Sequence, residues 1–150
     1  MQVHRGCAIP EEYLYDVELN TWVRLDDDGS ALLGMTDMAQ SMCGKIVSIS
    51  FKPTGRAIAR GRTVAVIESA KWVGPFRAPL SGTLTATNEE AFAADGLIAN
   101  RDPYGAGWIA RVEPTAFDAE REHLLDGVSA FPLFRDIIER DEITCMRCAD

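Results

Sequence analysis

Short runs of β-branched and aromatic residues alternate with turn residues through the first three quarters of the chain. The runs are TWVRL (21–25), ALLGM (31–35), KIVSISF (45–51), TVAVI (63–67), GTLTAT (82–87) and WIARV (108–112), and Gly, Pro, Asn and Ser residues separate them. Closely spaced short strands are typical of a β-sandwich or β-barrel. The pattern therefore predicts a mostly β fold for residues 1–114.

Helical spacing occurs in two places. Residues 36–42, TDMAQSM, begin with Thr36 or Asp37 as the N-cap and predict one or two helical turns. After Pro114, apolar residues recur at helical spacing with interruptions at Gly127 and Pro132, which predicts two or three short helices over 115–142, packed on the β-domain. Residues 143–150 have no core-forming pattern, and we expect a flexible tail that carries a Cys-x-x-Cys motif.

Composition limits the classes of function. A length of 150 residues with 47% hydrophobic content fits one compact domain, and a net charge of −8 argues against nucleic acid as a partner. No apolar stretch approaches the roughly 20 residues that a membrane span needs, and the N-terminus lacks the pattern of a secretion signal. We therefore expect a cytoplasmic protein without membrane insertion.

Basic residues concentrate between positions 44 and 82. This segment holds seven Lys and Arg residues against one acid, Glu68, in a chain that is acidic overall. Two interpretations stay open, namely a solvated basic face and a docking surface for acidic partner proteins.

The four cysteines do not predict a metal site. Cys7 and Cys43 are isolated, and Cys145 and Cys148 form CMRC close to the C-terminus. We expect no stable disulfide framework in a reducing cytoplasm, and with only two histidines we expect no metal centre. Cys145 and Cys148 are a candidate thiol relay, or else a pair of ordinary free thiols.

Lys71 lies between two similar segments, GKIVSISF (44–51) and GTLTATNE (82–89), where a hairpin would join two related halves. A hairpin tip gives little of the burial that lowers the pKa of a catalytic lysine, and no nearby set of His, Ser or paired carboxylates completes an enzyme site. We therefore expect a lysine that is presented to another protein, or a simple solvated turn lysine, and no intrinsic turnover.

Three motifs resemble the glycine cleavage H protein. The stretch IESAKWVGPFRAPLSG (67–82) is similar to the lipoyl attachment site of that family, ESVK…SPVSG. Upstream, GMTDMAQSMCGKIV (34–47) resembles GITDYAQ…LGDIV, and downstream NRDPYGAGWIARVEP (100–114) resembles NEDPYGEGWLFKI. The resemblance covers roughly residues 17–130, with the motifs in the same order and spacing.

The resemblance implies a flattened lipoyl-type β-barrel, a barrel-sandwich hybrid with pseudo-twofold symmetry. It also implies that lipoate is attached to Lys71 as a swinging arm by lipoate ligase or another lipoate-attachment enzyme, which would recognise Glu68 and Ser69. The DPYG motif would mainly shape a turn, with Tyr104 and Trp108 as anchors in the core.

Several positions depart from the H-protein pattern. Asn20 stands where that family usually has His, Trp72 replaces a small residue, the segment after Val47 is basic, and the cysteines are additional. Together these departures suggest a carrier with other partners and another cargo. In this respect the chain resembles the lipoate-binding proteins of sulfur oxidisers, which carry sulfur and work with a heterodisulfide-reductase-like complex. The alternative is an H protein that serves glycine decarboxylase, aminomethyltransferase and dihydrolipoamide dehydrogenase. A third hypothesis is an unmodified binding module.

Overall fold

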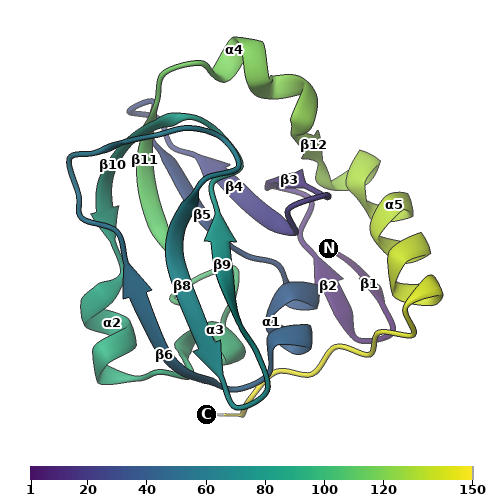
Figure 1. The fold of residues 1–150 in the computed structure, drawn as a ribbon. Helices are drawn as coiled ribbons and strands as arrows, with labels where there is room; N and C mark the ends of the chain where they lie inside the picture. The colour runs from purple at the N-terminus through teal and green to yellow at the C-terminus, as the bar shows by residue number, and fades with distance from the viewer. Residues whose placement is uncertain (150) are drawn as a thin grey trace.

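Two antiparallel sheets pack face to face in the body of the protein (Figure 1). The computed structural model describes residues 1–149. The seven-stranded sheet has the order β12-β3-β4-β5-β11-β10-β7 and the three-stranded sheet has the order β6-β8-β9. The first sheet is built from β3 (Leu14–Asp16), β4 (Thr21–Leu25), β5 (Ala31–Met35), β7 (Ala57–Ile58), β10 (Gly82–Thr87), β11 (Ala110–Pro114) and β12 (Leu125–Asp126), and the second from β6 (Ile46–Phe51), β8 (Thr63–Ser69) and β9 (Val73–Arg77).

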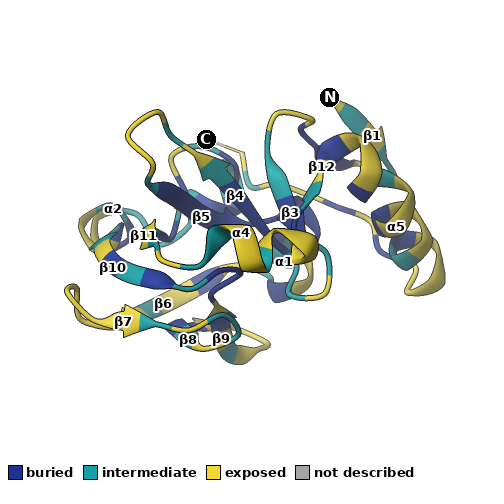
Figure 2. Cartoon of the chain, turned by 90° about the horizontal axis from the view of Figure 1, so that it is seen from above, coloured by how far each residue is buried: buried dark blue, intermediate teal, exposed yellow. Residues whose placement is uncertain are grey.

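The hydrophobic core lies between these sheets. Alternation in β8 sends Ile67 inward, where it is 1% exposed, while Val66 and Glu68 face outward. Leu33 and Leu84 of the larger sheet pack in the same cluster as Ile67 and Phe76 of the smaller one. Figure 2 shows the result, with β4 and β5 largely buried and the chain around β7 exposed. The mostly β fold predicted from the sequence is confirmed.

Helices cover the ends and one side of the sandwich. Thr36, one of the two N-cap residues expected from the sequence, caps α1 (Asp37–Cys43) by accepting a hydrogen bond from the Ala39 amide. The short helices α2 (Glu89–Ala94) and α3 (Ile98–Arg101) fall where only turns were expected. After β11 the chain forms α4 (Phe117–Glu120), the 3₁₀ turn η1 (Arg121–His123), β12 and α5 (Gly127–Arg140).

Helix α5 runs through Pro132, so the predicted interruption there is wrong. Proline removes one helical hydrogen bond, here to the carbonyl of Val128. Both Pro132 and Val128 are exposed, so that water can satisfy this carbonyl. The opposite face of α5 buries Phe134 and Ile138 in a second hydrophobic cluster. None of the described helices is long and apolar enough to cross a membrane.

The two ends of the chain are joined, which the sequence did not predict. The strands β1 (Gln2–His4) and β2 (Cys7–Ile9) form a small hairpin beside α5 (Figure 1). Cys7 makes a disulfide with Cys145, and their Cα atoms are 4.8 Å apart. The expectation that no disulfide forms is wrong for this pair, because the fold brings positions 138 residues apart into contact. Residues 143–149 lie along the protein body, with Ile143 and Cys145 buried, although the sequence shows no core-forming pattern there.

Candidate functional site

Lys71 occupies the exposed tip of the hairpin between β8 and β9. Only Ala70, Lys71 and Trp72 separate the two strands, and the Ser69 amide donates to the Trp72 carbonyl oxygen over 2.7 Å. The Lys71 amide donates to Ser69 Oγ over 3.3 Å. The backbone of the turn is therefore fixed from within, while the lysine itself faces outward.

The hydroxyl of Ser69 fastens this hairpin to the rest of the protein. Ser69 is 7% exposed, and its Oγ donates to the Cys43 carbonyl oxygen at the end of α1 over 2.6 Å. Glu68 points to the opposite, solvent-facing side of β8, where Ser48 donates to its carboxylate over 3.4 Å. Of the two residues expected to be recognised by a lipoylating enzyme, Glu68 is accessible, whereas the Ser69 hydroxyl is engaged inside the protein.

We expect Ser69→Ala to lower the free energy of unfolding by about 1–3 kcal/mol, because the buried Cys43 carbonyl loses its donor. Chemical denaturation of both proteins measures the difference. Ser48→Ala is the matched control, since Ser48 lies exposed in the neighbouring strand, and should change stability by less than about 0.5 kcal/mol. Equal effects of the two substitutions would contradict the anchoring role of Ser69.

Gly44 forms the floor beneath the lysine stem. A Cβ placed on Gly44 would lie 2.9 Å from Lys71 Cε and 3.5 Å from its Cδ, and the backbone of Gly44 has a φ of +82°. A side chain at this position would therefore push against Lys71 and would strain the backbone. Sequence reasoning did not single out Gly44, because nothing in the local pattern indicates that the lysine lies over it.

Asn100 holds the chain on both sides of this floor. It is 2% exposed, its Nδ2 donates to the Gly44 carbonyl oxygen over 2.8 Å, and its Oδ1 accepts from the Ile46 amide over 3.0 Å. The same Nδ2 donates to Gln40 Oε1 over 3.2 Å. Asn100, the first residue of the NRDPYG motif, thus bears directly on the support of Lys71.

A groove of about 450 Å³ opens beside the hairpin. Its walls come from α1, β8, β9 and the turn before β4, and they are mainly apolar. Trp72 lines the groove and also folds back over Gly74 of its own hairpin. Asn20 lies in the left-handed region with a φ of +59° and lines the same groove. The lining includes Asn20, Met35, Met42, Cys43, Ile67, Trp72 and Phe76.

A free thiol, Cys43, is buried in the wall of this groove. Burial raises the pKa of the Cys43 thiol, with a smaller opposing effect from the hydrogen bond to Ser69 and from the charge of Lys71. The thiol therefore stays protonated, and unreactive, to a higher pH than a free cysteine.

We expect Cys43 to react with iodoacetamide at least about tenfold more slowly than Cys148 at pH 8, because only the thiolate attacks and Cys43 is 4% exposed. Cys148 is the internal reference, since it is also free and is partly exposed. Peptide mass spectrometry over a time course measures both rates. Equal rates in the folded protein would show that the groove wall does not shield Cys43.

The basic segment is mostly unpaired. Among residues 1–149, only Arg60 of its seven cations forms an ion pair, with Asp16 over 2.6 Å. The cations that face solvent without an ion pair in this part of the chain are Lys45, Lys52, Arg56, Arg62, Lys71 and Arg77. Within the same residues, no three His, Cys, Asp or Glu side chains gather where they would hold a metal ion.

The fold and this site define a small β-protein that presents one lysine on a rigid hairpin beside an apolar groove, which is the arrangement of a carrier with a prosthetic arm. The family model for the glycine cleavage H-protein matches residues 13–135. The chain belongs to this family, whose members are lipoyl carriers without catalytic turnover and hold lipoate on a lysine.

Individual relatives extend the match almost to both termini. The chain is 42% identical over 149 residues to a probable glycine cleavage system H protein 2 of Sulfolobus acidocaldarius, covering 98% of this chain and 99% of that one. It is 38% identical over 145 residues to glycine cleavage system H protein 2 of Aquifex aeolicus, covering 97% and 89%. The crystal structure of a glycine cleavage system H protein from Mycobacterium marinum superposes with a TM-score of 0.72 at 28% identity, covering 84% and 99%.

Proposed function

We propose that this chain carries lipoate on Lys71 and delivers an aminomethyl group between the enzymes of glycine cleavage. The observation that carries the proposal is the placement of Lys71, which is exposed at the tip of a hairpin, with its stem over Gly44 and a groove alongside. The names of the relatives support glycine cleavage, which reverses the preference for sulfur carriage that the sequence departures suggested.

The residues around Lys71 fit a lipoyl group. The exposed amine is free to form an amide, and Gly44 leaves room for the stem, which a Cβ would occupy. The groove offers apolar and sulfur-containing side chains to a dithiolane, among them Met35, Met42 and Trp72. When bound, the lipoyl group supplies a disulfide that opens to accept cargo. The chain itself contributes the position of the amine and an apolar wall that excludes water.

The partners in this proposal are a lipoate-attachment enzyme such as lipoate ligase, glycine decarboxylase, aminomethyltransferase and dihydrolipoamide dehydrogenase, in the cytoplasm. The exposed cations around β6 and β8 favour partner surfaces that are acidic. Glu68 next to the lysine offers the attachment enzyme a carboxylate.

Sulfur carriage is the second candidate, and one observation favours it. Cys43 places a free thiol in the groove wall close to Lys71. In this role Lys71 would hold the lipoyl group, whose reduced form would supply the thiol acceptor for sulfane sulfur, and a persulfide donor would leave as a thiol. The proposed relay through Cys145 and Cys148 loses support, because Cys145 is bonded to Cys7. The unmodified binding module remains the third candidate.

Mass spectrometry of the lipoylated protein distinguishes these functions. One sample is incubated with glycine and a glycine decarboxylase that is active on its own H protein, and another with glutathione persulfide. The proposal predicts an aminomethyl adduct in the first sample only. Sulfur gain in the second sample without an aminomethyl adduct in the first would overturn it in favour of sulfur carriage. A chain that no lipoate-attachment enzyme of its host modifies would favour the binding module.

A further inference from the structure

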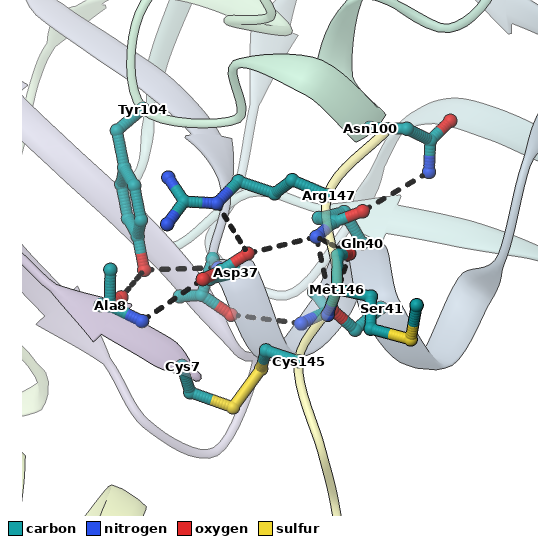
Figure 3. A network of polar contacts seen from close by, with 12 residues as sticks. Cys7, Ala8, Asp37, Gln40, Ser41, Asn100, Tyr104, Cys145, Met146 and Arg147 are labelled. Atoms are coloured by element: carbon teal, nitrogen blue, oxygen red, sulfur yellow. Dashed lines mark hydrogen bonds and ion pairs between the residues drawn. A yellow bond between two sulfur atoms is a disulfide. The ribbon is translucent and has the colours of Figure 1, made fainter. Parts of the chain in front are cut away.

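The C-terminal residues 143–149, called the strap below, cross the protein next to the support of Lys71. The Cys145 amide donates to the Arg5 carbonyl oxygen over 3.1 Å, and the Cys148 amide donates to the Asn100 carbonyl oxygen over 2.9 Å. Between them, Met146 exchanges hydrogen bonds with helix α1, accepting from Gln40 Nε2 over 2.8 Å and donating to Ser41 Oγ over 3.1 Å (Figure 3). The strap therefore bridges the first hairpin, α1 and α3.

The residues that hold the strap also hold the floor beneath the lysine. Gln40 and Asn100 bond to each other, and Asn100 fixes Gly44 and Ile46 as described above. Gln40 and Asn100 each contact both the strap and the segment from Gly44 to Ile46, which lies beneath the Lys71 side chain. Direct contacts therefore connect the strap to the segment beneath Lys71.

The strap also supplies the charge partner of a buried carboxylate. Asp37 is 0% exposed, and its oxygens accept from the Ala8 amide over 2.9 Å and from Gln40 Nε2 over 2.8 Å. Arg147, on the strap, is the cation beside it, with Nε 3.7 Å from Oδ1 (Figure 3). Departure of the strap would leave Asp37 without a cation and Gln40 Nε2 without one of its acceptors, both within α1.

One covalent bond keeps the strap in place. Beyond Ile143, Cys145 is the buried apolar anchor, whereas Met146 is 76% exposed and the remaining contacts are hydrogen bonds and the Arg147 ion pair. The disulfide partners, Cys7 and Cys145, both lie outside residues 13–135, where the family model matches. The disulfide therefore joins the two segments that flank the part of the chain matched by the family model, and without it the strap resembles an ordinary chain terminus that opens readily.

We propose that the Cys7–Cys145 disulfide is a redox site, reduced by dithiols, that controls the support of Lys71 through the strap. One thiolate of the dithiol attacks a disulfide sulfur and forms a mixed disulfide, and the second thiol displaces the protein sulfur. The dithiol leaves as a cyclic disulfide, and its two protons and two electrons remain on Cys7 and Cys145 as thiols. The reduced strap detaches, and the segment from Gly44 to Ile46 becomes mobile.

Cys148 does not replace this bond in the observed arrangement. Residues 145–148 form no helix or turn, and three extended steps span about 10 Å, more than the roughly 7 Å between Cα atoms that a disulfide tolerates. A bond between Cys145 and Cys148 would therefore require the strap to leave Gln40 and Asn100. The Cys-x-x-Cys motif thus contributes to the redox site only after the strap opens.

Amide hydrogen exchange on the complete chain without lipoate tests the proposal. We expect exchange at Cys148, Gly44 and Ile46 to become at least about tenfold faster in dithiothreitol than in the oxidised protein. In dithiothreitol these amides should exchange by an opening that costs clearly less free energy than the global unfolding that the amides of β4 and β5 report. Cys145→Ala should reproduce this effect without reductant, and Cys148→Ala should behave like the wild type. Mass spectrometry of alkylated thiols confirms the redox state in each sample.

Two results would overturn the proposal. If Cys7 and Cys145 are reduced while Gly44 and Ile46 keep their protection, the disulfide is only a covalent staple at the chain ends. If Gly44 and Ile46 exchange in dithiothreitol only as fast as the amides of β4 and β5, which report global unfolding, the effect is global destabilisation and no local control exists. Because the test uses the chain without lipoate, its result is independent of which cargo Lys71 carries.

Discussion

Lys71→Arg abolishes lipoylation while leaving the fold intact. Formation of the lipoyl amide requires a neutral amine as nucleophile, and the arginine guanidinium stays protonated at every pH at which the protein is folded. The side chain at position 71 is exposed, so the change in unfolding free energy should stay within about 0.5 kcal/mol. Intact mass after incubation with a lipoate-attachment enzyme and lipoate measures the loss.

The matched controls are Lys45→Arg and Lys52→Arg, which complete the set of lysines in this chain. Both lysines are exposed and both lie in the basic segment, so these variants make the same chemical change in a similar setting. They should be lipoylated as fully as the wild type. Lipoylation of the Lys71→Arg variant at either other lysine would contradict the assignment of the site.

Cys145→Ala lowers the stability of the oxidised protein by about 3–5 kcal/mol. The disulfide closes a loop of 138 residues, and in the chain-entropy model such a long loop restricts the unfolded chain by about 5 kcal/mol. Measured values for disulfides are commonly lower, near 2–4 kcal/mol. Alanine is the suitable replacement, because a serine hydroxyl at this buried position would add a desolvation cost.

Urea denaturation with and without reductant measures this effect. The wild type in reductant should become as unstable as Cys145→Ala, and the variant should not respond to reductant. Cys148→Ala keeps the disulfide and is the matched control. A wild type whose stability is the same within about 0.5 kcal/mol in both conditions would contradict the structural importance of the bond.

Local patterns in the sequence were sufficient for much of the fold. Runs of β-branched and aromatic residues between turn residues predict where the strands lie, and the pair Thr36 and Asp37 predicts where α1 begins, because both depend on neighbouring residues only. Pro132 misled the prediction, since the cost of a proline inside a helix depends on whether the carbonyl that it frees can reach water. That information lies in the packing of α5 and not in its sequence.

The site was predictable only in its most exposed part. The position of Lys71 on a hairpin followed from the turn residues around it and from the resemblance to the lipoyl attachment motif. The contacts of Gly44, Asn100 and Ser69 beneath it depend on three segments that meet only in the folded chain. The same holds for Cys7 and Cys145, whose separation in sequence gives no hint that they pair.

Peptide mapping of the protein purified from its native host tests the central claim most directly. Trypsin does not cleave after an acylated lysine, so lipoylation at Lys71 should yield one peptide that spans residues 63–77 and carries the lipoyl mass. Attachment at Lys71 predicts this modified peptide, cleavage after Lys45, and a peptide of residues 46–56 without added mass, because trypsin does not cleave between Lys52 and Pro53. Complete cleavage after Lys71, without a lipoyl mass on any peptide, would contradict the account.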